Sequence, residues 1–274
     1  MRGLIQSNQI RRRRLIIRAA VFSVVVIGAL AAVSFAFSTE MLELTTVRVS
    51  GNHAVETGAI ESVVAEETGE RFAGLFTRTN TLLIPREEVT ERIRAISPYI
   101  AAVSLSTDFP HTLLVHVAER SPAYVWCRAT IEEATAVRSC YFVDKEGFIY
   151  GIAPIFSTPV YIELVGSLYR KETLSNNHEP IGSSFLHPEM FVNVITIVGH
   201  VRDAGLDPHM LVVYDENDAE IIATSGVRIK FSPIIQSDDF LKLFATIIKA
   251  KVLDRKPKYI DVRFDNKIFY TPED

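Results

Sequence analysis

The pattern of apolar and polar positions begins with a continuous apolar run near the start of the chain. No charged residue occurs from Ala19 to Phe37, and a helix of 19 residues is roughly 28 Å long, close to the hydrocarbon thickness of a bilayer. Arginines precede the run, whereas Glu40 and Glu43 follow it. The positive-inside bias therefore predicts one membrane pass with the N-terminus in the cytoplasm and residues 41–274 outside. A cleaved signal peptide is the alternative, but its apolar region would be shorter, about 7–15 residues.

The pattern after this run predicts a small module with the order strand, helix, helix, strand, strand. Alternation at Thr46–Val49 indicates a strand, and two amphipathic helices follow it, separated by a polar connection that reaches about Thr81. Pro85 suits the first position of the second helix, which must end before Pro98. The other predicted boundaries are the end of the first helix near Gly69, strands at 101–107 and 113–117, and a turn at Phe109-Pro110-His111.

The pattern changes after Ser121-Pro122, where short alternating segments predominate. Lys145-Glu146-Gly147 is typical of a hairpin turn, and a polar loop without periodicity covers Arg170–His178. Helices are predicted from Pro188 to about Gly205 and at Asp239–Lys251. The predicted strands are 123–127, 141–144, 148–150, 160–164, 211–214, 220–224, 227–231, 259–264 and 267–270. Together they predict an α+β domain with a mostly antiparallel sheet and two helices.

Charge is distributed unevenly along the 274 residues. Residues 1–40 carry six of the 29 basic residues and one of the 33 acidic residues, which leaves 23 basic and 32 acidic residues in the remainder. A body with a net charge of −9 argues against nucleic acid as a partner. Because only one apolar run is long enough to span a bilayer, the sequence also argues against a channel or a multi-span transporter within this chain.

The sequence contains no signature of a catalytic or metal site. It lacks a GxSxG elbow, a phosphate-binding glycine loop and an HExxH motif, and no two of its seven histidines are spaced i, i+4. His116 alternates with apolar residues, which favours a structural histidine over a metal ligand. Asp215–Asp218 lacks the Gly and Glu of a calcium loop, so a polar turn is favoured there. We therefore expect no enzyme, cofactor or small-molecule substrate; a membrane-anchored hydrolase would need clustered carboxylates or a nucleophile in a cleft.

The two cysteines, Cys127 and Cys140, border the predicted strands of one hairpin on the extracytoplasmic side, where oxidation is allowed. A disulfide closing a loop of about 14 residues would stabilise the fold by about 3 kcal/mol. Two buried free thiols are the alternative, because two cysteines alone give no spacing pattern to test.

The last predicted strands have a regular alternation. Ile260, Val262 and Phe264 are expected to face the core, and Tyr259, Asp261 and Arg263 the other side. A terminal strand can be an exposed edge, which a partner segment can extend by strand addition. The alternative is a central strand or a covered edge, and the pattern alone does not choose between them.

Several short motifs follow one another in a specific order. After the basic N-terminus and the anchor, the first module begins LTTVRVSGN and ends VSLSTDFPHTLLVHVAERSPAYVW, and YFVDKEGFIYG and YIDVRFDNKIFY follow. The most specific are Glu119-Arg120-Ser121-Pro122-Ala123, Val143-Asp144-x-x-Gly147 and Ile260-Asp261-Val262-Arg263. In this order, over nearly the whole chain, they resemble the FtsQ/DivIB family of bacterial cell-division proteins.

The resemblance implies a domain organisation in which the first module is a POTRA domain. The expected parts are a cytoplasmic tail at 1–18, a transmembrane helix at 19–37, a POTRA-like domain at 44–121 and an FtsQ-type β-domain at 122–274. The Cys127/Cys140 pair and the Arg170–His178 loop lie outside the family pattern.

The resemblance also implies a non-enzymatic scaffold of the divisome, located in the cytoplasmic membrane at the septum. Members of the family link early division proteins to septal peptidoglycan synthesis by binding FtsB- or DivIC-like and FtsL-like coiled-coil membrane proteins through the last strands of the β-domain. Transferred by motif, the implied partner-binding residues are Tyr259, Asp261, Arg263, Phe264, Lys267, Phe269 and Tyr270.

The competing function is a POTRA-bearing component of envelope protein transport or assembly, which would bind clients by strand pairing. The chain has one such module and lacks the repeated alternating segments of about ten residues that are typical of an outer-membrane barrel. This pattern favours the division scaffold.

Overall fold

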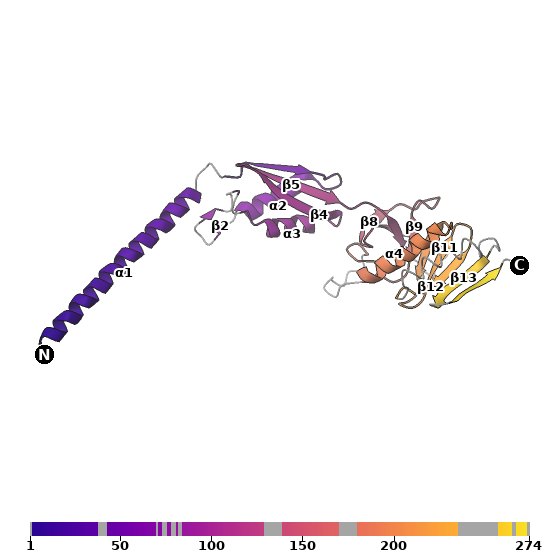
Figure 1. Ribbon diagram of the computed structural model, residues 1–274. Coiled ribbons are helices and arrows are strands. Elements are labelled where there is room, and N and C mark those ends of the chain that lie inside the picture. Colours follow the sequence, from indigo (N-terminus) through magenta and orange to yellow (C-terminus); the bar gives the residue numbers. More distant parts are fainter. Residues whose placement is uncertain are drawn as a thin grey trace. The chain divides into compact units, whose positions relative to one another are not determined.

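The computed structural model describes residues 2–37, 43–69, 71–72, 76–77, 81, 84–128, 139–169, 180–234, 257–264 and 267–272. The chain divides into two compact units, Met1–Glu119 and Arg120–Asp274 (Figure 1). The predicted helix at Asp239–Lys251 and the predicted loop at Arg170–His178 lie outside the described residues.

The first helix, α1 (Arg2–Phe37), contains the expected apolar run. Its segment Arg13–Ala31 has a mean hydropathy of 2.1, and none of that segment is buried against the rest of the protein. By length and composition this helix can cross a membrane, since a helix that is apolar on all sides needs an apolar environment. The prediction of an N-terminal apolar helix is confirmed.

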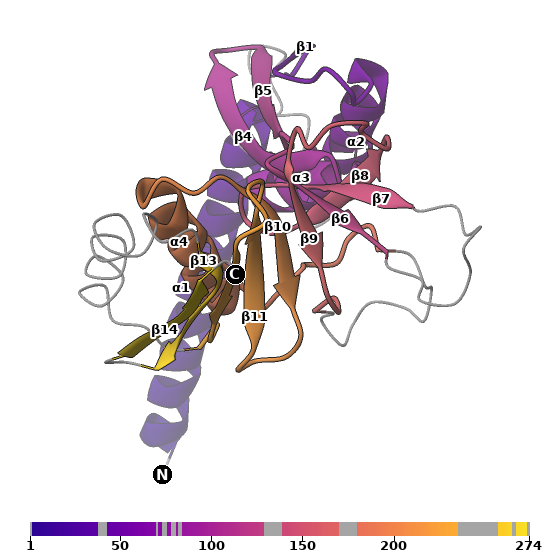
Figure 2. The same cartoon turned by 90° about the vertical axis from the view of Figure 1, so that its right-hand side faces the viewer.

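The first unit also contains the predicted module. Strand β5 lies between the other two strands of its sheet, parallel to β1 and antiparallel to β4 (Figure 2). Both helices pack on one face of this sheet, with Ile60, Val64, Val89 and Ile93 buried against Val115. A two-stranded ladder of β2 (Arg71–Phe72) and β3 (Phe76–Thr77) lies within the connection that the sequence predicts to be polar. The main elements are β1 (Thr46–Ser50), α2 (Thr57–Gly69), α3 (Arg86–Ile96), β4 (Ile100–Asp108) and β5 (Thr112–Glu119).

Glu119, the last residue of β5, holds the loop that precedes α2. Its carboxylate accepts hydrogen bonds from the backbone N–H groups of His53 (2.8 Å), Ala54 (2.9 and 3.0 Å) and Val55 (3.0 Å). Burial raises the pKa of Glu119, but these three backbone donors favour the charged form more strongly, so its pKa lies below the ordinary value.

The second unit is built on a nine-stranded sheet of order β14-β13-β12-β11-β10-β9-β6-β7-β8. Helix α4 (Pro188–Asp203) buries Phe191, Val194 and Val198 in the core of this sheet (Figure 1). The strands are β6 (Tyr124–Cys127), β7 (Cys140–Val143), β8 (Ile149–Ala153), β9 (Ile162–Val165), β10 (Pro208–Val213), β11 (Ala219–Ala223), β12 (Arg228–Phe231), β13 (Pro257–Phe264) and β14 (Lys267–Pro272).

The sheet is mixed, with antiparallel pairs in the majority as predicted. Five of its eight described ladders are antiparallel. The parallel ladders join β9 to β6 and to β10, and β12 to β13. The structure therefore confirms the α+β class, with helices packed on the three-stranded and the nine-stranded sheets.

The motifs around Arg120 and Asp144 contact each other at the start of the second unit. Buried Asp144 accepts hydrogen bonds from the backbone N–H groups of Glu146 and Phe148 (2.9 Å each) and from Nη1 of Arg120. The Arg120 guanidinium carbon lies 4.1 Å from the centre of the Phe148 ring, within cation–π range. Gly147 has φ +85°, and a Cβ there would lie 2.9 Å from the Phe191 ring, so this turn requires glycine. These motif residues therefore fix a hairpin.

Candidate partner-binding site

The candidate site lies at the β14 end of the nine-stranded sheet. Strand β13 is internal, because it pairs with β12 on one side and with β14 on the other. Among the described strands, β14 forms one edge of this sheet and β8 the other. The strand with the predicted alternation, β13, is therefore central, the alternative that its pattern left open, and among the described strands the edge on this side is β14.

Strand β13 follows the predicted alternation only over its first part. Ile260 and Val262 are fully buried in the core, as expected. Phe264, expected in the core, is instead 48% exposed, so that expectation is wrong. The reason is a register shift between Asp261 and Phe264, which places one extra residue in β13 opposite β14 and reverses the facing of Phe264.

Phe264 joins Phe269 of β14 to form an exposed aromatic pair. The two ring centroids are 5.4 Å apart and the rings meet edge to face, while Phe269 is 53% exposed. Lys267, also exposed, is the cross-strand partner of Phe264, so its side chain lies on the same face. We call these three residues the aromatic edge.

Asp261 and Arg263 form a fork on the outer face of β13, and Asp261 is only 7% exposed. Nε of Arg263 donates to Asp261 Oδ1 at 3.0 Å, and Nη2 donates to Oδ2 at 2.6 Å. The backbone N–H of Arg263 also donates to Oδ1, at 3.1 Å. Burial raises the pKa of Asp261, but its bonds to Arg263 outweigh burial, so the pKa lies below its ordinary value. Both side chains are thus held mainly by each other.

Neighbouring strands extend this fork into a charged ladder. Asp218 Oδ2 lies 3.7 Å from Nη1 of Arg263 and 3.8 Å from Nζ of Lys230. Glu220 is only 1% exposed and accepts hydrogen bonds from Nη2 of Arg228 (2.7 Å) and from the hydroxyl of Tyr214 (3.1 Å). Burial, followed by the hydrogen bond to Glu220, raises the pKa of Tyr214, and Glu220 raises the pKa of Arg228.

Tyr259 lies at the centre of this face, directly opposite Arg228 on β12. It is half-buried, and burial followed by the charge of Asp261 raises the pKa of its hydroxyl. Tyr270 differs from the other six implied residues in its side of the sheet, because it packs against the core on the opposite face. The structure thus brings six of the seven implied residues onto one face.

The charged residues of the neighbouring strands were not predicted from the sequence as part of this site. Glu220, Arg228 and Lys230 belong to β11 and β12, and the described structure pairs Glu220 directly with Lys230. Their signal in the sequence is that each alternates with buried residues such as Ile221 and Ile229. Alternation places them on the face away from the core, but the order of the strands is needed to place them beside Asp261.

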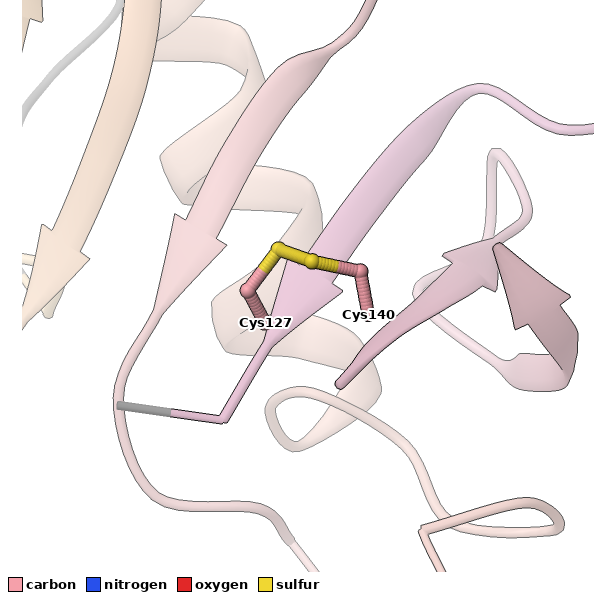
Figure 3. The surroundings of a disulfide bond; sticks show 2 residues. All are labelled: Cys127 and Cys140. Atoms are coloured by element: carbon pink, nitrogen blue, oxygen red, sulfur yellow. A yellow bond between two sulfur atoms is a disulfide. The ribbon is translucent and has the colours of Figure 1, made fainter. Parts of the chain in front are cut away.

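Cys127 and Cys140 are joined by a disulfide in the structure (Figure 3). They are directly opposite each other on β6 and β7, and both are buried. Val125 and Ala153 are buried beside them. The disulfide therefore closes the loop between two strands of the sheet core, far along the strand order from β14.

The described residues contain no group of three or more His, Cys, Asp or Glu side chains placed to hold a metal ion. His116 lies on β5 with Nδ1 3.2 Å from Oγ of Ser50. Oδ1 of Asp215 accepts the backbone N–H groups of Asn217 and Asp218 at 2.7 and 2.9 Å, a polar turn.

Residues 42–120 match the family model described as POTRA domain, FtsQ-type. A search of curated proteins gives no significant match. The matched segment covers β1 to β5, the strand and helix order found in the first unit. With a POTRA domain of FtsQ type at residues 42–120 and an apolar helix before it, the chain fits an FtsQ/DivIB-like protein.

Proposed function

We propose that this protein is a single-pass membrane scaffold of the bacterial divisome. The FtsQ-type POTRA domain supports a role in division, and α1 supports a membrane anchor. In the proposed orientation the basic segment 1–18 is cytoplasmic and the two folded parts, 44–121 and 122–274, are extracytoplasmic. The anchor and the POTRA domain serve recruitment to the septum.

The proposed partners are FtsB- or DivIC-like and FtsL-like coiled-coil membrane proteins, which bind at β14 and so link early division proteins to septal peptidoglycan synthesis. The observation that carries this proposal is the edge strand itself: β14 pairs with β13 on one side, and among the described strands none pairs with its other side. A partner segment that adds a strand there completes the backbone hydrogen bonds of the edge.

The aromatic edge supplies the side-chain part of the proposed interface. Phe264 and Phe269 present apolar area beside β14, and exposed aromatic residues next to a polar rim are typical anchors of protein interfaces. Lys267 adds a positive charge. Asp261 and Arg263 act by holding β13 at its bulge, because their charged groups are already hydrogen-bonded to each other.

The proposal is tested with the full chain in lipid nanodiscs, titrated with the FtsB-like protein encoded in the same genome. We expect Phe269→Ala to weaken binding by about 2 kcal/mol, roughly 30-fold, as for an interface anchor. The matched control is Ile152→Ala, which removes an exposed apolar side chain on β8, the opposite edge of the same sheet. Equal affinities of the two variants would refute the β14 interface, and no binding by the unmodified chain would refute this choice of partner.

A further inference from the structure

The two edges of the POTRA sheet differ in length and charge. Strand β1 has five residues and carries exposed Arg48 at its centre. Strand β4 has nine residues and no charged residue before its last position, Asp108. Short strands and central charges protect an edge against further pairing, whereas a long uncharged edge favours it. Of the two edges, β4 is therefore the one open to strand addition.

We propose that β4 is a self-association site, at which a second copy of this chain adds its own β4 in antiparallel orientation. The described structure pairs β4 only with β5, through eight residue pairs. The backbone groups of β4 that point away from β5 thus form a second row of donors and acceptors. A copy of the same strand carries the matching row.

A two-fold axis at Ser104, the middle residue of β4, gives the pairing with the greatest overlap. In that register the regular part of β4, from Ala102 to Ser106, is paired in full, and Ser104 faces its own copy; the register shift of β4 between Ile100 and Ala102 lies outside this stretch. Asp108, the one charged residue of β4, lies at the end of the strand, away from Asp108 of the second copy, so no like charges meet across the pair.

The same register buries apolar side chains that the single chain leaves half-exposed. Val103 and Leu105 are half-buried on the helix-facing side of β4. With the axis at Ser104, Val103 of each copy lies beside Leu105 of the other. Such a pair of strands buries much less area than a standard interface, so association is weak in dilute solution. Confinement of both copies to one membrane raises their effective concentration.

This site is independent of the proposed division partners, because it uses the POTRA sheet and a second copy of the chain. It is tested with full-length protein in detergent micelles by sedimentation velocity at low salt. The variant Ala102→Lys with Ser106→Lys places two lysine pairs opposite each other in the proposed register, since residue 102 faces residue 106 of the other copy. We expect it to associate about tenfold more weakly than the unmodified chain.

The opposite-charge variant, Ala102→Asp with Ser106→Asp, is expected to be equally weak alone. Mixing the two variants brings Lys opposite Asp, and a mixed dimer is expected to form at least as well as the unmodified dimer. This recovery separates a pairing defect from a folding defect. The matched control, Thr46→Lys with Ser50→Lys, puts the same charges on the β1 edge and leaves dimerisation unchanged. A monomeric unmodified chain, or no recovery on mixing, overturns the proposal.

Cross-linking of the full chain in lipid vesicles tests the register itself. Ser104→Cys places two thiols opposite each other at the proposed axis, within the Cα separation that a disulfide spans. Oxidation is expected to give a product of twice the 30.7 kDa chain mass, which reductant reverses. Thr46→Cys, on the β1 edge, gives little of this product. Equal yields from the two variants contradict pairing along β4.

Discussion

Asp261→Asn tests whether the fork on β13 stabilises the last strands through its charge. Asn keeps the shape of Asp261 and one acceptor oxygen, but it removes the negative charge that faces the Arg263 guanidinium at 2.6 Å. Hydrogen bonds to charged groups contribute about 1.5–3 kcal/mol when buried. Because a third of the Arg263 side chain is exposed, screening by solvent reduces the expected loss to about 1–2 kcal/mol.

The chain carries a natural probe for this measurement. Trp126 is the single tryptophan, and its side chain is buried in the core of the second unit. Its fluorescence therefore follows the unfolding of that unit by urea, while the first unit is silent. Asp203→Asn, at the exposed end of α4, is the matched control and is expected to change the free energy of unfolding by less than about 0.5 kcal/mol.

The dependence of the free energy of unfolding on pH shows whether the charge of Asp261 is responsible. The pKa of Asp261 is lowered in the folded protein, so the fork stabilises the fold above the ordinary carboxyl pKa of about 4, and this contribution is lost as the pH falls through the lower folded value. The free-energy difference between the unmodified chain and Asp261→Asn is expected to be constant from about pH 6 to 8 and to shrink below about pH 4. A difference that stays constant to pH 3, or that is absent at pH 7, would show that the charge of Asp261 does not stabilise the last strands.

Other expected outcomes concern the first unit, the disulfide and one turn. Three backbone amides hold Glu119 in its charged form, so Glu119→Gln is expected to speed hydrogen exchange of the amides of His53 to Val55 about fivefold at pH 7, corresponding to about 1 kcal/mol. The control Glu88→Gln, on the exposed face of α3, is expected to leave this exchange unchanged. The effect of Glu119 falls away as the pH drops below about 4, and persistence there contradicts it. Reduction of the Cys127–Cys140 disulfide is expected to lower the free energy of unfolding by about 3 kcal/mol, seen as a lower Tm by Trp126 fluorescence. The control variant, Cys127→Ser with Cys140→Ser, is expected to melt at the same temperature with and without reductant. An unmodified chain whose Tm is the same with and without reductant contradicts the prediction. Gly147→Ala, strained at φ +85° and against the Phe191 ring, is expected to destabilise the second unit by about 1–3 kcal/mol in the same assay, and Gly182→Ala, strained at φ +91° but with open space around it, by less.

Much of the fold follows from local patterns in the sequence. The apolar run marks α1, and helical spacing of residues such as Ile60, Val64, Val89 and Ile93 marks the two helices that cover the POTRA sheet. Strict alternation marks β4 and β5, whose inward residues are mostly half-buried in β4 and buried in β5. These elements were predictable because each depends on residues close together in the chain.

The facing of Phe264 was not predictable, since it depends on where β14 pairs with β13. A single extra residue after Asp261 reverses the side chains that follow, and alternation alone carries no sign of it. The burial of Asp261 was missed for a related reason: a carboxylate is read as exposed unless its partner is known, and here Arg263 covers it.

The charged ladder required the strand order of the sheet. Parallel pairing of β12 with β13 brings Arg228 opposite Tyr259 and Lys230 opposite Asp261, although about 30 residues separate the members of each pair in the chain. Pairing between strands so distant in sequence leaves no local pattern. The aromatic edge and the charged ladder thus depend on tertiary structure. The sequence predicted only that some of their residues face away from the core.

Hydrogen exchange shows directly whether a division partner adds a strand along β14. The full chain in nanodiscs is compared with and without the FtsB-like protein, and exchange is followed at the amides of Lys267 to Thr271 and, as an internal control, of Ile149 to Ala153 on β8. Exchange at β14 is expected to be at least tenfold slower in the complex, with unchanged exchange at β8. Binding with unchanged exchange at β14, or with protection at β8 instead, would rule out strand addition at β14.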